Sequence, residues 1–230
     1  MGDPPSDRRS RLVRLDPVWL RVFGELAAFV VALPFLVLLP RGDSRPVLVV
    51  PAFTASDTQT IPLRLVLRLL GYRPHGWGLG VNRGLHEATI AALIDRLEDL
   101  HDRHGVPLDV VGWSLGGVFG RHLARVRPAL VRQVVTLGSP LHSMEAKRAW
   151  SPPDTPTSSI YSKSDSVVDW RDSLVDPGPG RENVEVRGTH YGLAHNPSVI
   201  MVIADRLARD PLGRDPFVPG RLVRGLYTGS

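Results

Sequence analysis

The sequence contains no cysteine, and its only lysines are Lys147 and Lys163. The absence of cysteine excludes disulfides, thiolate chemistry and cysteine-ligated zinc sites. Basic charge comes almost entirely from arginine, and 28 basic against 23 acidic residues give a formal net charge of only +5. The arginines are spread along the chain, and no helix-turn-helix, zinc-finger or RNA-binding signature accompanies them. The composition therefore does not favour a nucleic-acid partner.

Internal repeats and metal-ligand spacings are missing too. The histidines at 101, 104, 122 and 142 lack acidic neighbours at such spacings, so we expect neither a metal nor another cofactor. What the sequence does have is 43% hydrophobic residues over 230 positions, which suits one domain. Strand and helix patterns alternate, which predicts an α/β fold with a mostly parallel sheet of about six strands flanked by helices. We expect strands at 47–50, 72–79, 108–112, 132–137, 158–161 and 184–187, and helices at 60–70, 87–104, 118–127 and 197–207.

The chain is predicted to have four segments. Residues 1–16 are polar and charged and predict a flexible tail. Within 17–40, apolar residues at helical spacing predict a helix, stopped or kinked at Pro34, that packs on the core; they are Trp19, Val22, Phe23, Leu26, Val30 and Leu33. Residues 41–210 hold the main domain with a small lid at about 141–157. Residues 211–230, rich in proline and glycine, predict an extended tail.

The uncharged run within 26–40 is the one segment suited to touch a membrane. It is shorter than the roughly 20 residues needed to span a bilayer, and proline breaks it. A secretory signal is not favoured, because Pro40-Arg41-Gly42-Asp43 offers no small-residue cleavage site. We expect a cytoplasmic protein, with peripheral membrane contact through residues 26–40 as the alternative to core packing.

The segment Gly112-Trp113-Ser114-Leu115-Gly116, followed by Gly117, comes directly after the apolar run 108–111. A Gly-x-Ser-x-Gly turn between a strand and a helix holds the serine hydroxyl clear of its neighbours, which predicts Ser114 as a nucleophile. The alternative is a glycine-rich β-to-α turn whose serine only caps the helix.

A serine nucleophile needs a base, and the base needs an acid that orients it. Asp165 follows the strand expected to end at Tyr161, and His190 follows the one expected to end at Arg187. Carboxyl ends of parallel strands share one edge of the sheet, so all three side chains are predicted to meet there. Asp169, Asp172 and Asp176 are rivals for the acid, and His195 is a rival for the base, although it precedes a helix start and is better explained by packing.

Together these segments resemble the α/β-hydrolase family, particularly its compact lipase-like esterases, over about 46–207. The most specific parts are the 112–117 turn and Gly188-Thr189-His190, with Gly192-Leu193 and Asn196-Pro197. The resemblance implies Ser114 as nucleophile, Asp165 as carboxylate and His190 as general base. It also implies an oxyanion hole from the backbone N–H groups of Leu115 and Phe53. Pro51 and Ala52 depart from the family's more usual His-Gly-x pattern in that loop.

The expected activity is cleavage of a carboxylic ester, small or lipidic, through an acyl-enzyme and without a cofactor. Acyl transfer and thioester or amide cleavage remain alternatives, and a catalytically silent binding module is a further one. Residue type suggests an apolar substrate rim that also includes Phe53 and Leu115. The predicted rim residues are Trp77, Trp113, Leu141, Trp150 and Trp170. The Gly-rich segment 77–84 is expected to bring Trp77 and Asn82 near the cleft.

Overall fold

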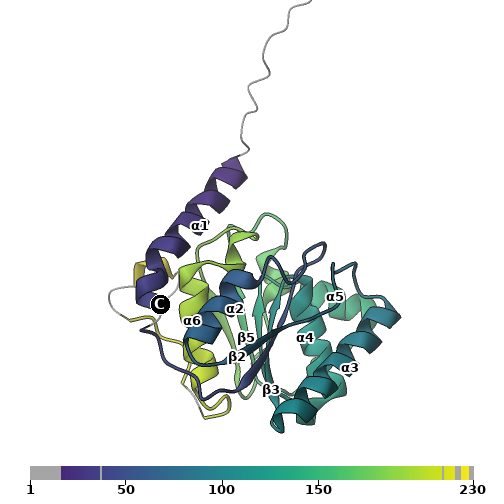
Figure 1. The fold of residues 1–230 in the computed structure, drawn as a ribbon. Coiled ribbons are helices and arrows are strands. Elements are labelled where there is room, and N and C mark those ends of the chain that lie inside the picture. Colours follow the sequence, from purple (N-terminus) through teal and green to yellow (C-terminus); the bar gives the residue numbers. More distant parts are fainter. Residues whose placement is uncertain (1–16, 37, 214, 221–223, 228–230) are drawn as a thin grey trace, which may run out of the picture.

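A parallel sheet forms the centre of the computed structural model, which describes residues 17–36, 38–213, 215–220 and 224–227 (Figure 1). The predicted tail 1–16 lies outside these residues. Six strands follow the order β2-β1-β3-β4-β5-β6, and each neighbouring pair is parallel. The predicted α/β class and strand number are thus confirmed. The strands are β1 (Pro46–Val50), β2 (Arg73–Gly76), β3 (Leu108–Trp113), β4 (Val131–Leu137), β5 (Thr157–Tyr161) and β6 (Arg181–Glu185).

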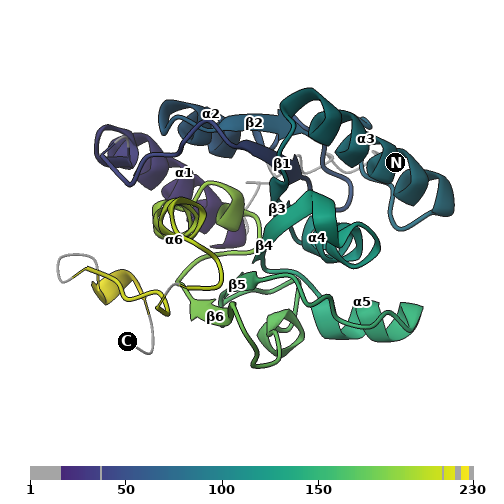
Figure 2. The ribbon, with the colours of Figure 1, turned by 90° about the horizontal axis from the view of Figure 1, so that it is seen from below.

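Helices cover both faces of the sheet (Figure 2). Side chains alternate along each strand, so Val47 and Val49 of β1 join one core while Leu48 and Val50 join the other. The first core contains residues of α1 (Pro17–Leu36), α2 (Ile61–Leu69) and α6 (Pro197–Ala208). The second contains residues of α3 (Glu87–His104) and α4 (Leu115–Val126). This two-sided burial produces the continuous apolar runs from which the central strands were predictable.

The edge strand β6 lies three residues earlier at its start than the sequence predicts. Only Val184 of this strand is buried, and Glu182 and Asn183 are not. An edge strand with one covered face tolerates polar residues, so the apolar signal marks only part of it.

Residues 141–157 are the segment predicted to form a lid, and the structure describes all of them. Their first part is the helix α5 (Leu141–Arg148), which packs beside α4, and Leu141 is buried in the core. Arg121 of α4 donates to Glu145 at 2.8 Å, and the two side chains are 4% and 10% exposed. Burial raises the pKa of Glu145, and Arg121 opposes that rise. A buried ion pair therefore anchors the helical part of a segment whose composition suggested a small lid or rim.

We expect Arg121→Met to lower the free energy of unfolding by about 3 kcal/mol, because it strands the Glu145 carboxylate in an apolar site. The double variant Arg121→Met/Glu145→Leu should recover most of this loss, since no buried charge remains. Urea unfolding of both variants followed by tryptophan fluorescence measures the difference. A single variant as stable as the wild type would contradict the anchoring role.

The helix α1 runs through Pro34 to Leu36, so the predicted stop at Pro34 is wrong. One side packs against α6 and buries Phe29 and Leu36. The predicted contact residues Phe23, Leu26 and Val30 instead lie on the opposite side, 41% to 58% exposed. Figure 1 shows α1 packed beside α6, with the N-terminal half of α1 projecting from the domain. Among the described residues, no helix combines the length and apolar character needed to cross a bilayer.

The C-terminal segment is only partly the extended tail that its composition predicts. Tyr227 follows a short 3-10 turn (Arg224–Leu226) and forms an antiparallel bridge with Val186. Its ring is 6% exposed, and its hydroxyl donates to the carbonyl of Ser198 in α6 at 2.9 Å. Burial raises the pKa of this phenol. An aromatic residue in a Pro- and Gly-rich segment thus holds the chain against α6.

Candidate active site

Ser114 occupies a sharp turn between β3 and α4. Its φ is 54° and its ψ is −122°, a strained backbone conformation for a residue with a side chain. A Cβ on Gly116 would lie 2.2 Å from the carbonyl oxygen of Val50, and one on Gly112 would lie 2.3 Å from the oxygen of Gly116. Only glycine allows β1, β3 and α4 to approach so closely. The turn therefore fixes the Ser114 hydroxyl at the carboxyl edge of the sheet.

A continuous hydrogen-bonded chain joins three side chains from separate loops. Nε2 of His190 lies 2.9 Å from Oγ of Ser114, and Nδ1 of His190 lies 2.6 Å from Oδ2 of Asp165. His190 is 4% exposed, and the Asp165 side chain is 2% exposed. The structure thus brings together the three residues that the sequence singles out. Burial keeps competing water away from both bonds.

The Asp165 carboxylate is itself oriented by the backbone. Its Oδ1 accepts hydrogen bonds from the N–H groups of Val167 and Val168 at 2.8 and 2.9 Å, which directs Oδ2 at the imidazole. Because a carboxylate only accepts, this contact places the ring proton on Nδ1 of His190. The lone pair of Nε2 then faces the Ser114 hydroxyl, as a proton acceptor must.

The rival acids and the rival base lie elsewhere. Asp169 accepts from the N–H of Arg171, with its side chain 56% exposed, and neither Asp172 nor Asp176 contacts His190. The ring of His195 meets Phe29 of α1 edge-on with centroids 6.5 Å apart, and burial lowers its pKa. His195 is a packing residue, as its position before a helix indicates.

Further contacts hold the His190 loop, and the sequence did not reveal them. Glu25 of α1 accepts from the N–H of Thr189 at 2.7 Å and from its hydroxyl at 2.5 Å. On the other side, Nε1 of Trp113 donates to the carbonyl of His190 at 3.0 Å. The available signal was that Glu25 is the only acidic residue in 20 residues of apolar helix. A carboxylate on such a helix needs a hydrogen-bonding partner.

Ser114 opens into a pocket of about 340 Å³. Of the predicted rim residues, Phe53 and Trp113 line it, whereas Trp77 and Leu141 are buried, each 1% exposed. Trp150 stacks on His122, and Trp170 stacks on Tyr161, away from the pocket. Trp77, Trp150 and Trp170 thus serve packing here, contrary to their predicted place at the rim. The observed lining is Ala52, Phe53, Thr54, Ala55, Gln59, Trp113, Ser114, Val167, His190 and Tyr191.

The loop after β1 carries Phe53 into this pocket. Asn82 is fully buried and holds the loop in place. Its side-chain amide donates to the carbonyl of Pro51 at 2.9 Å, and its backbone carbonyl accepts from the N–H of Thr54 at 2.8 Å. Leu115 is the first residue of α4, where backbone N–H groups lack partners within the helix. The two predicted oxyanion-hole residues thus adjoin Ser114, one in sequence and one across the pocket.

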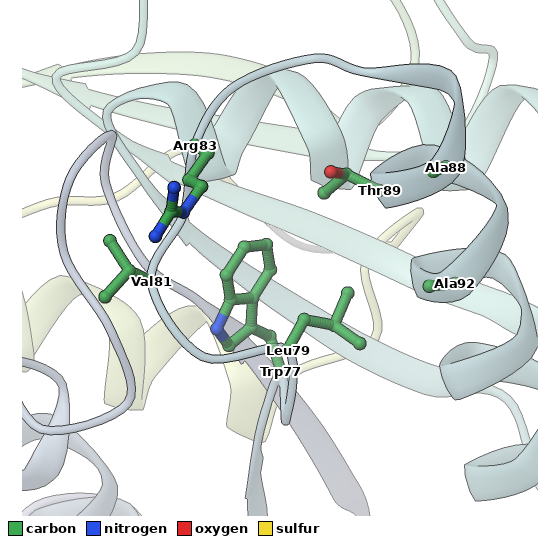
Figure 3. Close-up of a pocket in the computed structure, with 7 residues that line it drawn as sticks. All are labelled: Trp77, Leu79, Val81, Arg83, Ala88, Thr89 and Ala92. Carbon is green, nitrogen blue, oxygen red and sulfur yellow. The ribbon is translucent and has the colours of Figure 1, made fainter.

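The Gly-rich segment after β2 shapes a second depression of about 510 Å³, separate from the Ser114 pocket (Figure 3). One side of the depression is formed by Trp77, Leu79, Val81 and Arg83, and the other by Ala88, Thr89 and Ala92 of α3. The two pockets have no lining residue in common. Trp77 was expected near the cleft and lies here instead. Within the described chain, no group of three or more histidine, aspartate or glutamate side chains is arranged to hold a metal ion.

No protein-family model and no curated protein sequence matches this chain. Solved structures do. The mature lipase BlEst2 of Bacillus licheniformis superposes with a TM-score of 0.57 at 13% identity, covering 73% of this chain and 94% of its own. The pyrethroid hydrolase PytH superposes with a TM-score of 0.58 at 14% identity, and the match covers 73% of this chain and 98% of PytH. Mouse alpha/beta hydrolase domain-containing protein 10 superposes with a TM-score of 0.52 at 15% identity, and the match covers 73% of this chain and 89% of the mouse chain. At such identities the likeness shows the fold alone.

Proposed function

We propose that this chain, which has the α/β-hydrolase fold, cleaves carboxylic esters with Ser114, His190 and Asp165. The observation that carries the proposal is the buried hydrogen-bonded chain from Ser114 Oγ through His190 to Asp165, with contacts of 2.9 and 2.6 Å. The strained turn at Ser114 supports it, because strain is maintained where a side chain must be presented in one geometry.

In the proposed mechanism, Ser114 Oγ attacks the ester carbonyl while Nε2 of His190 accepts the hydroxyl proton. Asp165 stabilises the imidazolium that forms. The backbone N–H groups of Leu115 and Phe53 donate to the carbonyl oxygen as it gains negative charge. His190 then passes its proton to the departing alkoxide, leaving an acyl-enzyme. Water, deprotonated by His190, then attacks that ester. The bond to Ser114 Oγ breaks, His190 returns its proton to Oγ, and the carboxylic acid is released.

The pocket favours an apolar substrate. Phe53, Val167 and Tyr191 are 42% to 55% exposed at its mouth, and no arginine, lysine, aspartate or glutamate is among its lining residues. Such a lining binds acyl or alcohol groups by burial and gives little recognition of charge. One structural neighbour is named a lipase, which agrees with an ester substrate of this kind.

The test combines covalent labelling with a substrate series. A fluorophosphonate probe should label Ser114, identified by peptide mass spectrometry, and p-nitrophenyl esters from acetate to palmitate should be hydrolysed. The corresponding p-nitroanilide and thioester are measured in parallel. Faster turnover of either would replace the ester assignment, and folded protein that the probe leaves unlabelled would overturn the hydrolase proposal.

Glu25 is expected to act as a positioning residue for His190. We expect Glu25→Ala to lower kcat by about ten- to a hundredfold with little change in KM, because the Thr189 backbone loses its acceptor and His190 shifts. Glu25→Gln should retain most activity, since its amide oxygen still accepts from Thr189. Steady-state kinetics and melting temperatures of both variants are compared with those of Glu87→Ala on the surface of α3. Equal loss in the alanine and glutamine variants would contradict a positioning role.

A further inference from the structure

The helix α1 is apolar on all its sides, yet only one side is covered. Between Pro17 and Leu36 the only charged residues are Arg21 and Glu25. A helix that is apolar all round normally has all its sides buried. The uncovered side is here called the outer face, and its large apolar residues are each 41% to 79% exposed. Leu38, which lies just beyond the end of α1, is counted with them. The outer face comprises Leu20, Phe23, Leu26, Val30, Val31, Phe35 and Leu38.

The part of the outer face around Glu25 lies at the same edge of the sheet as the mouth of the Ser114 pocket. Glu25 contacts Thr189 next to His190, so this part of α1 lies at the carboxyl edge. The half of α1 before Glu25 projects from the body of the domain (Figure 1). The apolar mouth residues Phe53 and Tyr191 are exposed at this edge as well. Part of the exposed apolar surface of α1 thus lies at the edge where substrate must enter.

Positive charge accompanies the outer face. Arg21 and Arg187, both exposed, line a depression of about 500 Å³ between α1 and the His190 loop. Neither makes a salt bridge with another described residue. Residues 1–16, which precede α1, add four arginines against three aspartates. Apolar side chains flanked by arginines are typical of helices that bind anionic lipid, with the arginines at the phosphate level.

We propose that the outer face of α1 docks on an anionic phospholipid surface. Its apolar side chains enter the interface between headgroups and acyl chains, and Arg21 and Arg187 meet lipid phosphates. A second copy of the chain covering the same face would bring a second set of cations to the contact, which a lipid bilayer avoids. Docking in this way turns the mouth of the Ser114 pocket toward the membrane. That orientation rests on the proposed function, whereas lipid binding does not.

The test is vesicle flotation of the full chain, which needs no turnover. Vesicles of phosphatidylcholine alone are compared with vesicles containing 30 mol% phosphatidylglycerol as the probe. Phe23→Asp/Val30→Asp places two charges on the outer face at positions 58% exposed. Val106→Asp/Leu212→Asp is the matched control, because these residues are 41% and 67% exposed at the opposite edge of the sheet and change net charge equally.

We expect wild type and control to float with the anionic vesicles, and the Phe23→Asp/Val30→Asp variant to float about tenfold less. Raising salt should weaken the wild-type binding, because part of the attraction is ionic. Equal flotation of the two double variants would overturn the proposal. So would wild type that stays unbound and forms dimers in sedimentation velocity, since a second copy would then cover the outer face. Inactive protein that floats refutes only the hydrolase assignment, and active protein that does not float refutes only docking.

Discussion

Ser114→Ala is expected to lower kcat for p-nitrophenyl ester hydrolysis by a factor of about 10⁵ and to leave KM nearly unchanged. The hydroxyl oxygen forms the acyl-enzyme, so without it His190 can only activate water. Substrate binding should persist because the pocket of about 340 Å³ is lined mainly by other side chains. Steady-state kinetics with a fluorophosphonate titration of active sites measures both quantities.

Ser56→Ala is the matched control for this result. Ser56 also follows β1 at the carboxyl edge, but its hydroxyl donates to Gln59 at 3.0 Å and has no contact with His190. The control should keep full activity and full labelling. Turnover by Ser114→Ala within tenfold of wild type would mean that another group is the nucleophile.

Asp165→Asn is expected to lower kcat by about 10⁴-fold while the fold remains intact. The amide oxygen of asparagine can still accept from Val167 and Val168, as Oδ1 of the aspartate does. Its NH₂ group then faces Nδ1 of His190 and can only donate. The imidazole proton is driven to Nε2, where it blocks acceptance of the Ser114 proton.

Asp169→Asn supplies the comparison for this second result. Asp169 lies in the same loop and caps a short helical turn (Trp170–Ser173) from an exposed position. The Asp169→Asn variant should retain activity close to that of the wild type. If Asp169→Asn were the more damaging change, the acid would be misassigned and the loop would have to rearrange in the working enzyme. Near-ultraviolet circular dichroism of both variants checks that folding is unaffected.

The three residues of the hydrogen-bonded chain were predictable because their signals are local. A β-to-α turn with glycines at 112 and 116 predicts its own geometry, and parallel strands carry the following loops to one edge. Asp165 needed only to follow a strand closely, and so did His190. Their rivals failed for reasons also visible nearby, since Asp169 begins a helical turn and His195 precedes a helix.

The pocket lining was less predictable because it depends on tertiary contacts. Tryptophan at 77 was as plausible a rim residue as phenylalanine at 53, yet Trp77 is buried and Phe53 is 55% exposed. The Arg121–Glu145 pair that holds α5 against α4 joins two elements whose proximity no sequence pattern shows. For α1, apolar residues on every side left its covered side undetermined, and the predicted set mixed the two: Leu33 packs against the core, whereas Phe23 and Val30 are exposed.

The bond between Glu25 and Thr189 also bears on how the protein is made. The two residues are 164 positions apart, which is roughly 10 to 30 s of translation at usual ribosomal rates. Throughout that interval neither α6 nor the loop of Thr189 is available for α1 to pack against. The helix thus leaves the ribosome with both apolar sides bare, and chaperones or lipids can reach it before its own domain does.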